Sequence, residues 1–467
     1  MRTLVLSAIL ILTAGAAQAQ TGLLFDDVYL KHIAGNTGHP ERPERLTAIR
    51  DGLEKAGLMK TLVPITPRRV TDQELELVHK PSYVALVRRE LTNLQGVREL
   101  STGDTLVSSG SLEAAEFAAG GVLNVVDAVM SGKVKNAFAA VRPPGHHATP
   151  DRGMGFCIFN NVAIAARYLQ KKHGIGRVLI VDWDYHHGNG TQDIFYNDGT
   201  VFYFSTHHYG AYPGTGSASE TGAGPGAGKI LNVPMTPGAG DAEFLNVYET
   251  KLVPAARQFK PDFILISAGF DSMRRDLLGQ FNITPEGYAA MTRIVMKLAD
   301  EFSRGRVVSV LEGGYRLDGL AESVAAHVKT LQGDSKGAAF DSQAGTWVIN
   351  INKSQFPGGR PPKRQVTTIQ AIPGGVKNVT DIVDADGKAI HYEFTLMYDG
   401  KDYPVKDDPV RDSVSIRKVD DYTFDATNKK AGKVVNTVRA SYARDGKSRT
   451  MTTTVNGTTT STVWDRQ

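Results

Sequence analysis

Short apolar runs alternate with longer amphipathic segments from about residue 20 to residue 332, and this alternation is the strongest constraint on the fold. Six runs rich in β-branched residues are predicted strands: residues 136–141, 177–181, 201–205, 230–233, 262–267 and 306–311. Segments 161–173, 242–259 and 285–304 have helical length and periodicity. Strands and helices in alternation predict crossover connections and a mainly parallel sheet with helices on both faces.

The pattern changes near the C-terminus. Residues 333–344 are small and polar and are a predicted linker. Short alternating runs rich in Thr, Val and Tyr follow, at residues 346–350, 364–371, 379–384, 389–398, 413–419, 423–427, 434–441, 448–455 and 459–464. Pairs such as Asp386-Gly387 and Asn456-Gly457 between them are strong hairpin signals. We therefore predict a second domain over residues 345–467, an antiparallel all-β unit built as a small barrel or sandwich.

The composition is that of an ordinary globular protein, with 41% hydrophobic and 22% charged residues. A chain of 467 residues is longer than one hydrophobic core usually organises, which favours two domains. The formal net charge of +4 is too small at this length to indicate a nucleic-acid partner. The single cysteine, Cys157, permits no internal disulfide and is predicted to be a buried thiol.

Residues 1–19 have the features of a secretory signal peptide. A short basic start precedes an apolar run that ends near Ala16, and Ala17-Gln18-Ala19 is a small-x-small cleavage signal. A membrane anchor is the weaker alternative, because the run is shorter than the ~20 residues of a spanning helix. We expect the catalytic domain to occupy residues 20–332 of a secreted or periplasmic protein with no membrane span.

Residues able to carry chemistry follow four of the predicted strands. They lie in Arg142-Pro-Pro-Gly-His-His147, Asp182-Trp-Asp-Tyr-His-His-Gly-Asn-Gly190, Ala268-Gly-Phe-Asp-Ser272 and Glu312-Gly-Gly-Tyr315. The carboxyl ends of parallel strands meet at one edge of a sheet, where open α/β sheets bind their ligands. We therefore expect the four stretches to line one cleft.

Asp184, His186 and Asp271 are the predicted metal ligands. Asp184 and His186 are two positions apart, so their side chains point the same way on an extended segment, and Asp271 can approach from a neighbouring strand end. Catalytic zinc takes about three carboxylate or imidazole ligands and keeps an open position. Other divalent ions accept the same ligands. The alternative for either aspartate alone is a helix cap or turn former.

His146 and His147 suit proton transfer, because adjacent histidines on a tight loop do not easily bind one ion. One imidazole can deprotonate water that the ion has acidified, while the other gives or receives a proton. Asp182 and Asn189 are predicted to orient the rings of His146 and His147, respectively. Tyr315 can donate to an oxyanion, and a packed aromatic side chain is its alternative. Together these groups indicate hydrolysis of an amide or ester.

These stretches, with His39-Pro-Glu-Arg-Pro-Glu-Arg45 and Gly155-Phe-Cys157, resemble the zinc-dependent histone deacetylase family, which includes acetylpolyamine amidohydrolases. The resemblance covers about residues 22–332, and Asn189 is similar to class II members. It implies an arginase/deacetylase-like parallel eight-stranded sheet. It also implies one zinc ion on the three predicted ligands, acid and base roles for the two histidines, and carbonyl polarisation by Tyr315.

The resemblance further implies a substrate tunnel for an acyl-lysine side chain. Gly155, Phe156 and Tyr212 would wall it, and Tyr212 replaces the usual Phe, which bears on tunnel width and polarity. Leu278 stands where polyamine-selective members carry a gatekeeper Glu, which favours acyl-lysine-like substrates. A structural potassium ion would bind Asp182, Asp184, the His186 carbonyl, Ser205 and the Thr206 carbonyl.

We therefore predict a metal-dependent amidohydrolase that deacylates acylated peptides or small-molecule amines, with acetyl-lysine-like substrates favoured. Acetylpolyamines or other small amides are the alternative substrates, and a non-catalytic protein that binds acylated ligands is a third hypothesis. The C-terminal domain resembles secreted bacterial β domains with a lipocalin-like Gly345-Thr-Trp347 start. Ligand binding, substrate docking, dimerisation and a plain structural role stay open for it, as does assembly into a homo-oligomer.

Overall fold

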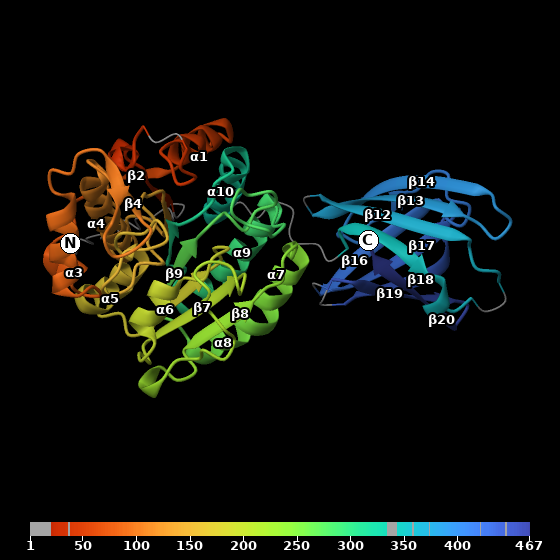
Figure 1. Cartoon of the computed structure of the whole chain (residues 1–467). Helices are drawn as coiled ribbons and strands as arrows, with labels where there is room; N and C mark the ends of the chain where they lie inside the picture. The colour runs from red at the N-terminus through yellow and green to blue at the C-terminus, as the bar shows by residue number, and fades with distance from the viewer. Residues whose placement is uncertain are drawn as a thin grey trace, which may run out of the picture.

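The computed structural model describes residues 20–35, 38–333, 343–356, 359–372, 374–420, 422–443 and 446–467. The predicted signal peptide, residues 1–19, and most of the predicted linker, residues 334–342, lie outside these ranges. The described residues form two large sheets (Figure 1). Each sheet has its own cluster of buried hydrophobic side chains.

The first large sheet has eight strands in the order β2-β1-β5-β10-β9-β6-β7-β8, and every pair is parallel. The strands are β1 (Thr21–Leu24), β2 (Val63–Ile65), β5 (Asn136–Ala139), β6 (Val178–Asp182), β7 (Val201–His207), β8 (Ile230–Pro234), β9 (Phe263–Ala268) and β10 (Val307–Leu311). The predicted parallel architecture is confirmed. Sequence patterning missed β1 and β2, which have only four and three residues and so no measurable period.

Helices cover both faces of this sheet, as predicted (Figure 1). They are α1 (Glu44–Lys55), α2 (Asp72–Leu75), α3 (Pro81–Leu91), α4 (Ser111–Met130), α5 (Asn161–His173), α6 (Asn189–Phe195), α7 (Asp241–Val247), α8 (Val253–Phe259), α9 (Pro285–Phe302) and α10 (Leu317–Leu331). The predicted start of α9 is confirmed, since the Thr284 hydroxyl accepts a hydrogen bond from the Gly287 backbone N–H. None of the described helices is long and apolar enough to cross a membrane.

The helix expected over residues 242–259 is interrupted. A π-helical turn, Tyr248–Leu252, separates α7 from α8. Pro254 lies in the first turn of α8 and has no backbone N–H to donate to the preceding turn. A continuous α-helix would leave that hydrogen bond unmade, and periodicity alone did not reveal this break.

The second large sheet is antiparallel and has ten strands in the order β14-β13-β12-β11-β20-β19-β18-β17-β16-β15. They are β11 (Gly345–Asn350), β12 (Arg364–Ile372), β13 (Gly375–Val383), β14 (Ala389–Met397), β15 (Tyr403–Pro404), β16 (Ser413–Asp420), β17 (Thr423–Lys430), β18 (Lys433–Tyr442), β19 (Ser448–Val455) and β20 (Thr458–Arg466). β11 and β20, the first and last strands along the chain, pair with each other. A bridge between Asp399, which follows β14, and Arg417 of β16 joins the two ends of the strand order. The sheet is therefore nearly barrel-shaped, which decides between the predicted barrel and sandwich.

Aromatic side chains fill the interior of this second sheet. Trp347, Tyr442 and Trp464 surround the buried Arg449 guanidinium, whose carbon lies 5.2, 5.8 and 4.5 Å from the three ring centroids. The Tyr422 hydroxyl donates to Glu249 of the π-helical turn over 2.9 Å, which links the second sheet to the first unit. The likeness of this unit to lipocalins stays a prediction.

Candidate active site

The order of the parallel strands places the four polar stretches side by side. β5, β10, β9 and β6 are consecutive neighbours in the sheet, and their carboxyl ends lie at one edge. Each strand leads directly into one of the stretches singled out in the sequence. Residues that are up to 173 positions apart along the chain, from Arg142 to Tyr315, are therefore brought into one site, as expected for a parallel sheet.

Asp184, His186 and Asp271 form a compact and almost fully buried cluster. One potential ligand atom of each residue lies within 4.8 Å of the others. The His186 Nδ1 atom is 3.2 Å from Asp184 Oδ1 and 3.0 Å from Asp271 Oδ2. Two carboxylates and an imidazole at this spacing, with His186 also facing a cavity, fit a divalent cation of the zinc type.

Backbone groups hold the two carboxylates in place. The Gly313 N–H donates to Asp184 Oδ2 and the Tyr185 N–H donates to Asp271 Oδ1, both over 2.9 Å. A Cβ atom at Gly269 would collide with the Asp184 carboxylate, and one at Gly313 would collide with that of Asp271. Glycine at these positions lets the main chain approach the cluster closely.

The charges of the three side chains also favour a cation. Burial raises the pKa of the Asp184 carboxyl, but the imidazoles of His146 and His186 outweigh burial and lower it. Burial and the Asp184 charge raise the pKa of Asp271 to about 7. Burial lowers the pKa of His186, yet the two aspartates raise it to about 10. In the protein without an ion the cluster therefore holds protons, which a divalent cation would replace.

His146 and His147 lie against each other beside the cluster, with ring centroids 4.0 Å apart. Their partners differ in charge: Asp182 Oδ2 is 3.0 Å from His146 Nδ1, and Asn189 Oδ1 is 2.8 Å from His147 Nδ1. Burial opposes protonation of His146, but Asp184 and the other nearby carboxylates raise its pKa to about 10. Burial and the charge of His146 lower the pKa of His147 well below its usual value.

The two rings are therefore chemically unequal. In the protein without an ion, the surroundings of His146 favour its protonated form and those of His147 favour its neutral form. Asn189 Oδ1 accepts the Nδ1 proton of His147, which leaves Nε2 as a free base. This arrangement pairs Asp182 with one histidine and Asn189 with the other, in the combination expected from the sequence.

Glu312 is a further functional candidate, for which the sequence predicted no role. Its Oε2 accepts the backbone N–H groups of Gly145 (2.6 Å) and His146 (3.1 Å), and its Oε1 accepts the Ser267 hydroxyl (3.2 Å). Burial raises the pKa of this carboxyl to about 7. Through these hydrogen bonds Glu312 fixes the backbone of the loop that carries His146 and His147. Only its position, directly after a strand, could have suggested this role.

Arg45, in the first turn of α1, contacts the turn that carries Tyr315. Buried Glu41 forms ion pairs with Arg142 and with Arg45 (3.1 Å for Arg45). The Arg45 Nε donates to the Gly314 carbonyl over 2.6 Å, and its guanidinium carbon is 5.0 Å from the centre of the Tyr315 ring. Arg45, held by its ion pair with Glu41, therefore fixes the turn that carries Tyr315.

The predicted substrate residues line one cavity of about 500 Å³. Gly155, Phe156, Tyr212 and Leu278 lie in its wall, together with Tyr315, and so do His147 and His186. Asp104, Tyr185, His208 and Gln280 also line it, and the sequence gave no motif by which to find them. The cavity therefore connects the solvent with the histidine base and the predicted metal ligands.

Three of the predicted potassium ligands, Asp182, Asp184 and Ser205, are neighbours in the structure. Asp182 and Ser205 are paired in register between β6 and β7, and Thr206 follows in β7. The Asp184 backbone N–H donates to Asp182 Oδ1 over 3.1 Å, so both carboxylates belong to one turn. Potassium binding itself stays a prediction.

His187, for which the sequence predicted no catalytic task, forms hydrogen bonds with Thr215 and Gln192, away from the cavity, in a packing role.

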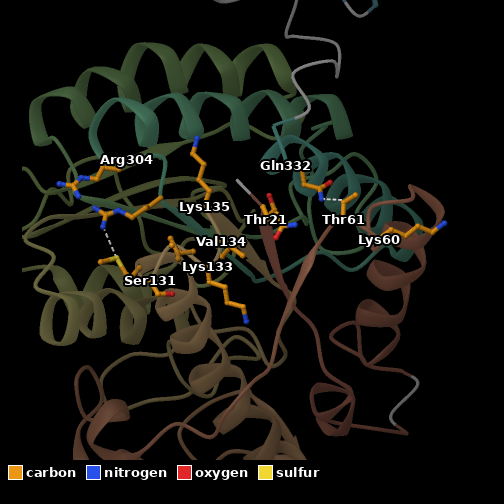
Figure 2. A pocket seen from close by; sticks show the side chains of 14 residues that line it. Thr21, Lys60, Thr61, Ser131, Lys133, Val134, Lys135, Arg304 and Gln332 are labelled. Atoms are coloured by element: carbon orange, nitrogen blue, oxygen red, sulfur yellow. Dashed lines mark hydrogen bonds between the residues drawn. The ribbon is translucent and has the colours of Figure 1, made fainter. Parts of the chain in front are cut away.

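A larger hollow of about 1100 Å³ lies at the opposite edge of the sheet, at the starts of β1, β5 and β10 (Figure 2). Its lining residues include five cations and no carboxylate, namely Lys60, Lys133, Lys135, Arg304 and Arg306. The labelled lysines and Arg304 point away from one another, so they do not converge on one ligand. The chemistry-bearing residues lie instead in the smaller cavity.

Comparisons with known proteins agree with this location. The profile of the histone deacetylase domain matches residues 39–331, which contain every residue of the site. Histone deacetylase 5 of Arabidopsis thaliana is 41% identical over 356 residues, covering 72% of this chain and 53% of that protein. Polyamine deacetylase HDAC10 of Homo sapiens is 44% identical over 310 residues, covering 63% of this chain and 45% of that protein.

A probable deacetylase of Archaeoglobus fulgidus is 42% identical over 301 residues, covering 64% of this chain and 82% of the relative. The chain spans about half the length of the plant and human proteins it matches. Among solved structures, the HD domain of HDA15 is 41% identical with a TM-score of 0.64, covering 68% of this chain and 90% of that one. The profile match ends before β11, the first strand of the second sheet.

Proposed function

Because this chain belongs to the histone deacetylase family, we propose that it is a metal-dependent amidohydrolase that removes acyl groups from amines. The observation that carries the proposal is that His147 and His186 line one cavity, while His146 packs on His147 and the two aspartates of the cation-binding cluster lie beside His186. A purely structural metal site would need neither the histidine pair nor an opening to solvent.

Asp184, His186 and Asp271 would hold the cation, with zinc as the proposed ion. A divalent ion there would polarise the amide carbonyl and lower the pKa of the attacking water. His147 would take a proton from the attacking water through Nε2 as the new C–O bond forms. Tyr315, whose pKa is raised well above its usual value by burial, keeps its proton and donates a hydrogen bond to the oxyanion.

His146 completes the reaction. The C–N bond breaks as the amine leaves, and the His146 imidazolium supplies the proton that the amine nitrogen needs. Asp182 Oδ2, which lies 3.0 Å from His146 Nδ1, stabilises the positive charge of the protonated ring. The products are a carboxylic acid and a free amine, and the two histidines exchange protons with solvent before the next cycle.

Acyl-lysine side chains are the favoured substrates. Leu278 lines the cavity and is 37% exposed, so an apolar side chain faces the incoming group at the predicted gatekeeper position. Acetylpolyamines are the second candidate, because Asp104 places a carboxylate in the cavity wall and a relative bears the name polyamine deacetylase. Parallel rates on an acetyl-lysine peptide and on acetylputrescine will decide between the two.

The central test uses two variants, His147→Ala and Tyr315→Phe. Both are expected to lose at least about 100-fold in turnover, in line with the loss of a base or an oxyanion donor, with normal metal content. Full activity in either variant would overturn its assigned role. Ligand binding without turnover by the metal-loaded wild-type protein would favour the alternative of a non-catalytic binding protein.

We also propose export through a signal peptide over residues 1–19 and a catalytic domain over residues 20–332. The features that support this are the basic start, apolar run and small-x-small site of the sequence. As a separate point, we propose a structural potassium ion near Asp182 and Ser205. N-terminal sequencing of the mature protein and elemental analysis of the purified protein test these points.

A further inference from the structure

Tyr185 and His208 form a linked pair in the wall of the active-site cavity, and the proposed mechanism assigns no role to either side chain. Tyr185 lies between Asp184 and His186 just after β6, and His208 follows β7, the neighbouring strand. The His208 backbone N–H donates to the Tyr185 carbonyl over 2.9 Å, and the Tyr185 hydroxyl is hydrogen-bonded to His208 Nδ1. The two residues are therefore joined through both their main chains and their side chains.

Aromatic packing holds the pair in place. The centroid of the Phe281 ring lies 4.8 Å from that of Tyr185 and 6.2 Å from that of His208. Tyr185 is only 3% exposed, whereas His208 is half-buried and lines the cavity. The phenol is thus a buried support, and the imidazole is the part of the pair that meets an entering substrate.

The hydrogen bond between the two side chains decides which nitrogen of His208 carries a proton. A phenol is protonated at neutral pH, and within the described part of the chain the Tyr185 hydroxyl has no acceptor other than His208 Nδ1. A neutral imidazole whose Nδ1 accepts a hydrogen bond carries its proton on Nε2. None of the described residues forms a hydrogen bond with that Nε2 atom, so His208 offers an unused N–H donor to the cavity.

Gln280 adds further donors close by. It precedes Phe281 in the chain, lines the same cavity and is exposed, and its side-chain amide is bonded to no other described residue. Amide and imidazole N–H groups are complementary to an oxygen acceptor of a ligand, and they offer nothing to the ammonium groups of a polyamine. This part of the wall therefore suits a substrate that carries an oxygen besides that of the scissile amide.

We propose that His208, oriented by Tyr185, is a specificity-determining residue whose Nε2–H donates to an α-carboxyl oxygen of an acyl-lysine and so selects amides derived from amino acids over acylated polyamines. This inference rests on the proposed deacylase function, in which Tyr315 already serves the oxygen of the scissile amide. The second oxygen is the α-carboxylate of a free acyl-lysine or the corresponding carbonyl in a peptide, and an acylated diamine has neither. A site built to bond such a group disfavours the analogue that lacks it, because its own donor is then left unpaired.

Two small substrates isolate this contact, because Nε-acetyl-lysine and N-acetylcadaverine differ only in the carboxyl group. His208→Phe keeps an aromatic ring and removes the donor, and it should lower the ratio of kcat/KM on acetyl-lysine to kcat/KM on acetylcadaverine about tenfold, equivalent to about 1.4 kcal/mol. The change should lie mainly in the KM for acetyl-lysine. His208→Gln, which carries an amide N–H near the place of Nε2, should recover most of the ratio. An unchanged ratio in His208→Phe would overturn the inference.

Tyr209→Phe is the matched control. Tyr209 is the next residue in the chain, is 51% exposed and lies outside the cavity lining, so its substitution should leave the ratio as in the wild type. A tenfold fall in this variant too would assign the effect to the loop as a whole and overturn the role of His208.

Tyr185→Phe tests the positioning role, measured on protein that holds one divalent ion per chain. Loss of the hydroxyl frees the His208 ring and should lower the same ratio, but it should cost little more once His208 is already Phe. Equal losses on the two substrates in Tyr185→Phe, or additive losses in the double variant, would show a general structural effect and overturn the positioning role.

The α-amide of Nε-acetyl-lysine separates the two sources of the oxygen. A response of its KM to His208→Phe equal to that of the free acid supports recognition of a carbonyl, as in a peptide, and a response confined to the free acid supports recognition of a carboxylate. Turnover of acetyl-lysine and acetylcadaverine at a ratio that His208→Phe leaves unchanged would overturn this inference alone. A metal-loaded wild-type protein that turns over no acylated amine would overturn the proposed function with it.

Discussion

Gly155→Ala provides the sharpest test of whether the position of the His147 ring limits turnover. Gly155 has a φ angle of 57°, in the left-handed region. A Cβ atom there would lie 2.7 Å from His147 Cγ and 2.9 Å from Tyr212 Cε1, and closer still to His147 Cδ2. Carbon atoms in ordinary contact are about 3.5–4.0 Å apart, so the ring or the loop must move by about 1 Å.

The size of the effect follows from what holds the ring. His147 is bonded to Asn189 over 2.8 Å and packs on His146, so it cannot retreat without losing contacts. A displacement of about 1 Å can cost about 100-fold in rate, equivalent to about 2.7 kcal/mol of activation free energy. Alanine in the left-handed region also costs about 1–2 kcal/mol in folding free energy.

Gly174→Ala separates these two effects. Gly174 ends α5 with a φ angle of 65°, and no atom lies within 4 Å of a Cβ built there. Both variants should be less stable in thermal unfolding, but only Gly155→Ala should lose kcat/KM on an acetyl-lysine peptide. Equal activity in the two variants would refute the argument that His147 must keep this position.

Three other predictions concern charge. Asn189→Asp places a carboxylate on the His147 ring, raises the pKa of that ring, and should move the acidic limb of the kcat/KM profile to higher pH by about one unit or more; an unmoved limb would exclude His147 as the titrating base. Asp271→Asn should leave the purified protein with far less than one divalent ion per chain after dialysis, measured by elemental analysis, and a full complement would exclude Asp271 as a ligand. Burial raises the pKa of the Glu312 carboxyl from its ordinary value of 4.5 to about 7, so its contribution to stability is fully present below pH 4.5 and is lost as the pH rises from 4.5 through 7. Glu312→Gln removes that loss, so the unfolding free energy of the variant should match that of the wild type near pH 4 and exceed it by up to about 3 kcal/mol near pH 8. Identical pH profiles would contradict this account.

The fold was predictable where the signal is local. A helix such as α5 can be predicted from the periodicity of its own residues, and its observed bounds agree with the prediction. Hairpin signals likewise indicated the antiparallel second sheet, because a two-residue turn fixes the pairing of its neighbours. The short β1 and β2 strands have too few residues to show a pattern, and they became visible only through pairing with β5 and with each other.

The candidate site was predictable to the extent that strand ends determine it. Asp184, His186 and Asp271 follow adjacent parallel strands, so the rule that such ends share an edge was sufficient to bring them together. The partners of His146 and His147 were also expected, because each needs an acceptor on its ring and the neighbouring stretch supplies two. Their catalytic roles stay predictions until the variants above are measured.

The sequence by itself determined the two sheet classes and the residue types at the carboxyl edge of the first sheet, since both depend on short-range patterns. Only the tertiary structure decided which buried groups touch. Glu312 beneath the histidine loop and Asp104 opposite Tyr212 are contacts between segments more than 100 residues apart. Such contacts depend on loop lengths and on the packing of whole elements. No local pattern in the chain encodes them, and the same loops decide how the rim of the cavity meets its substrate.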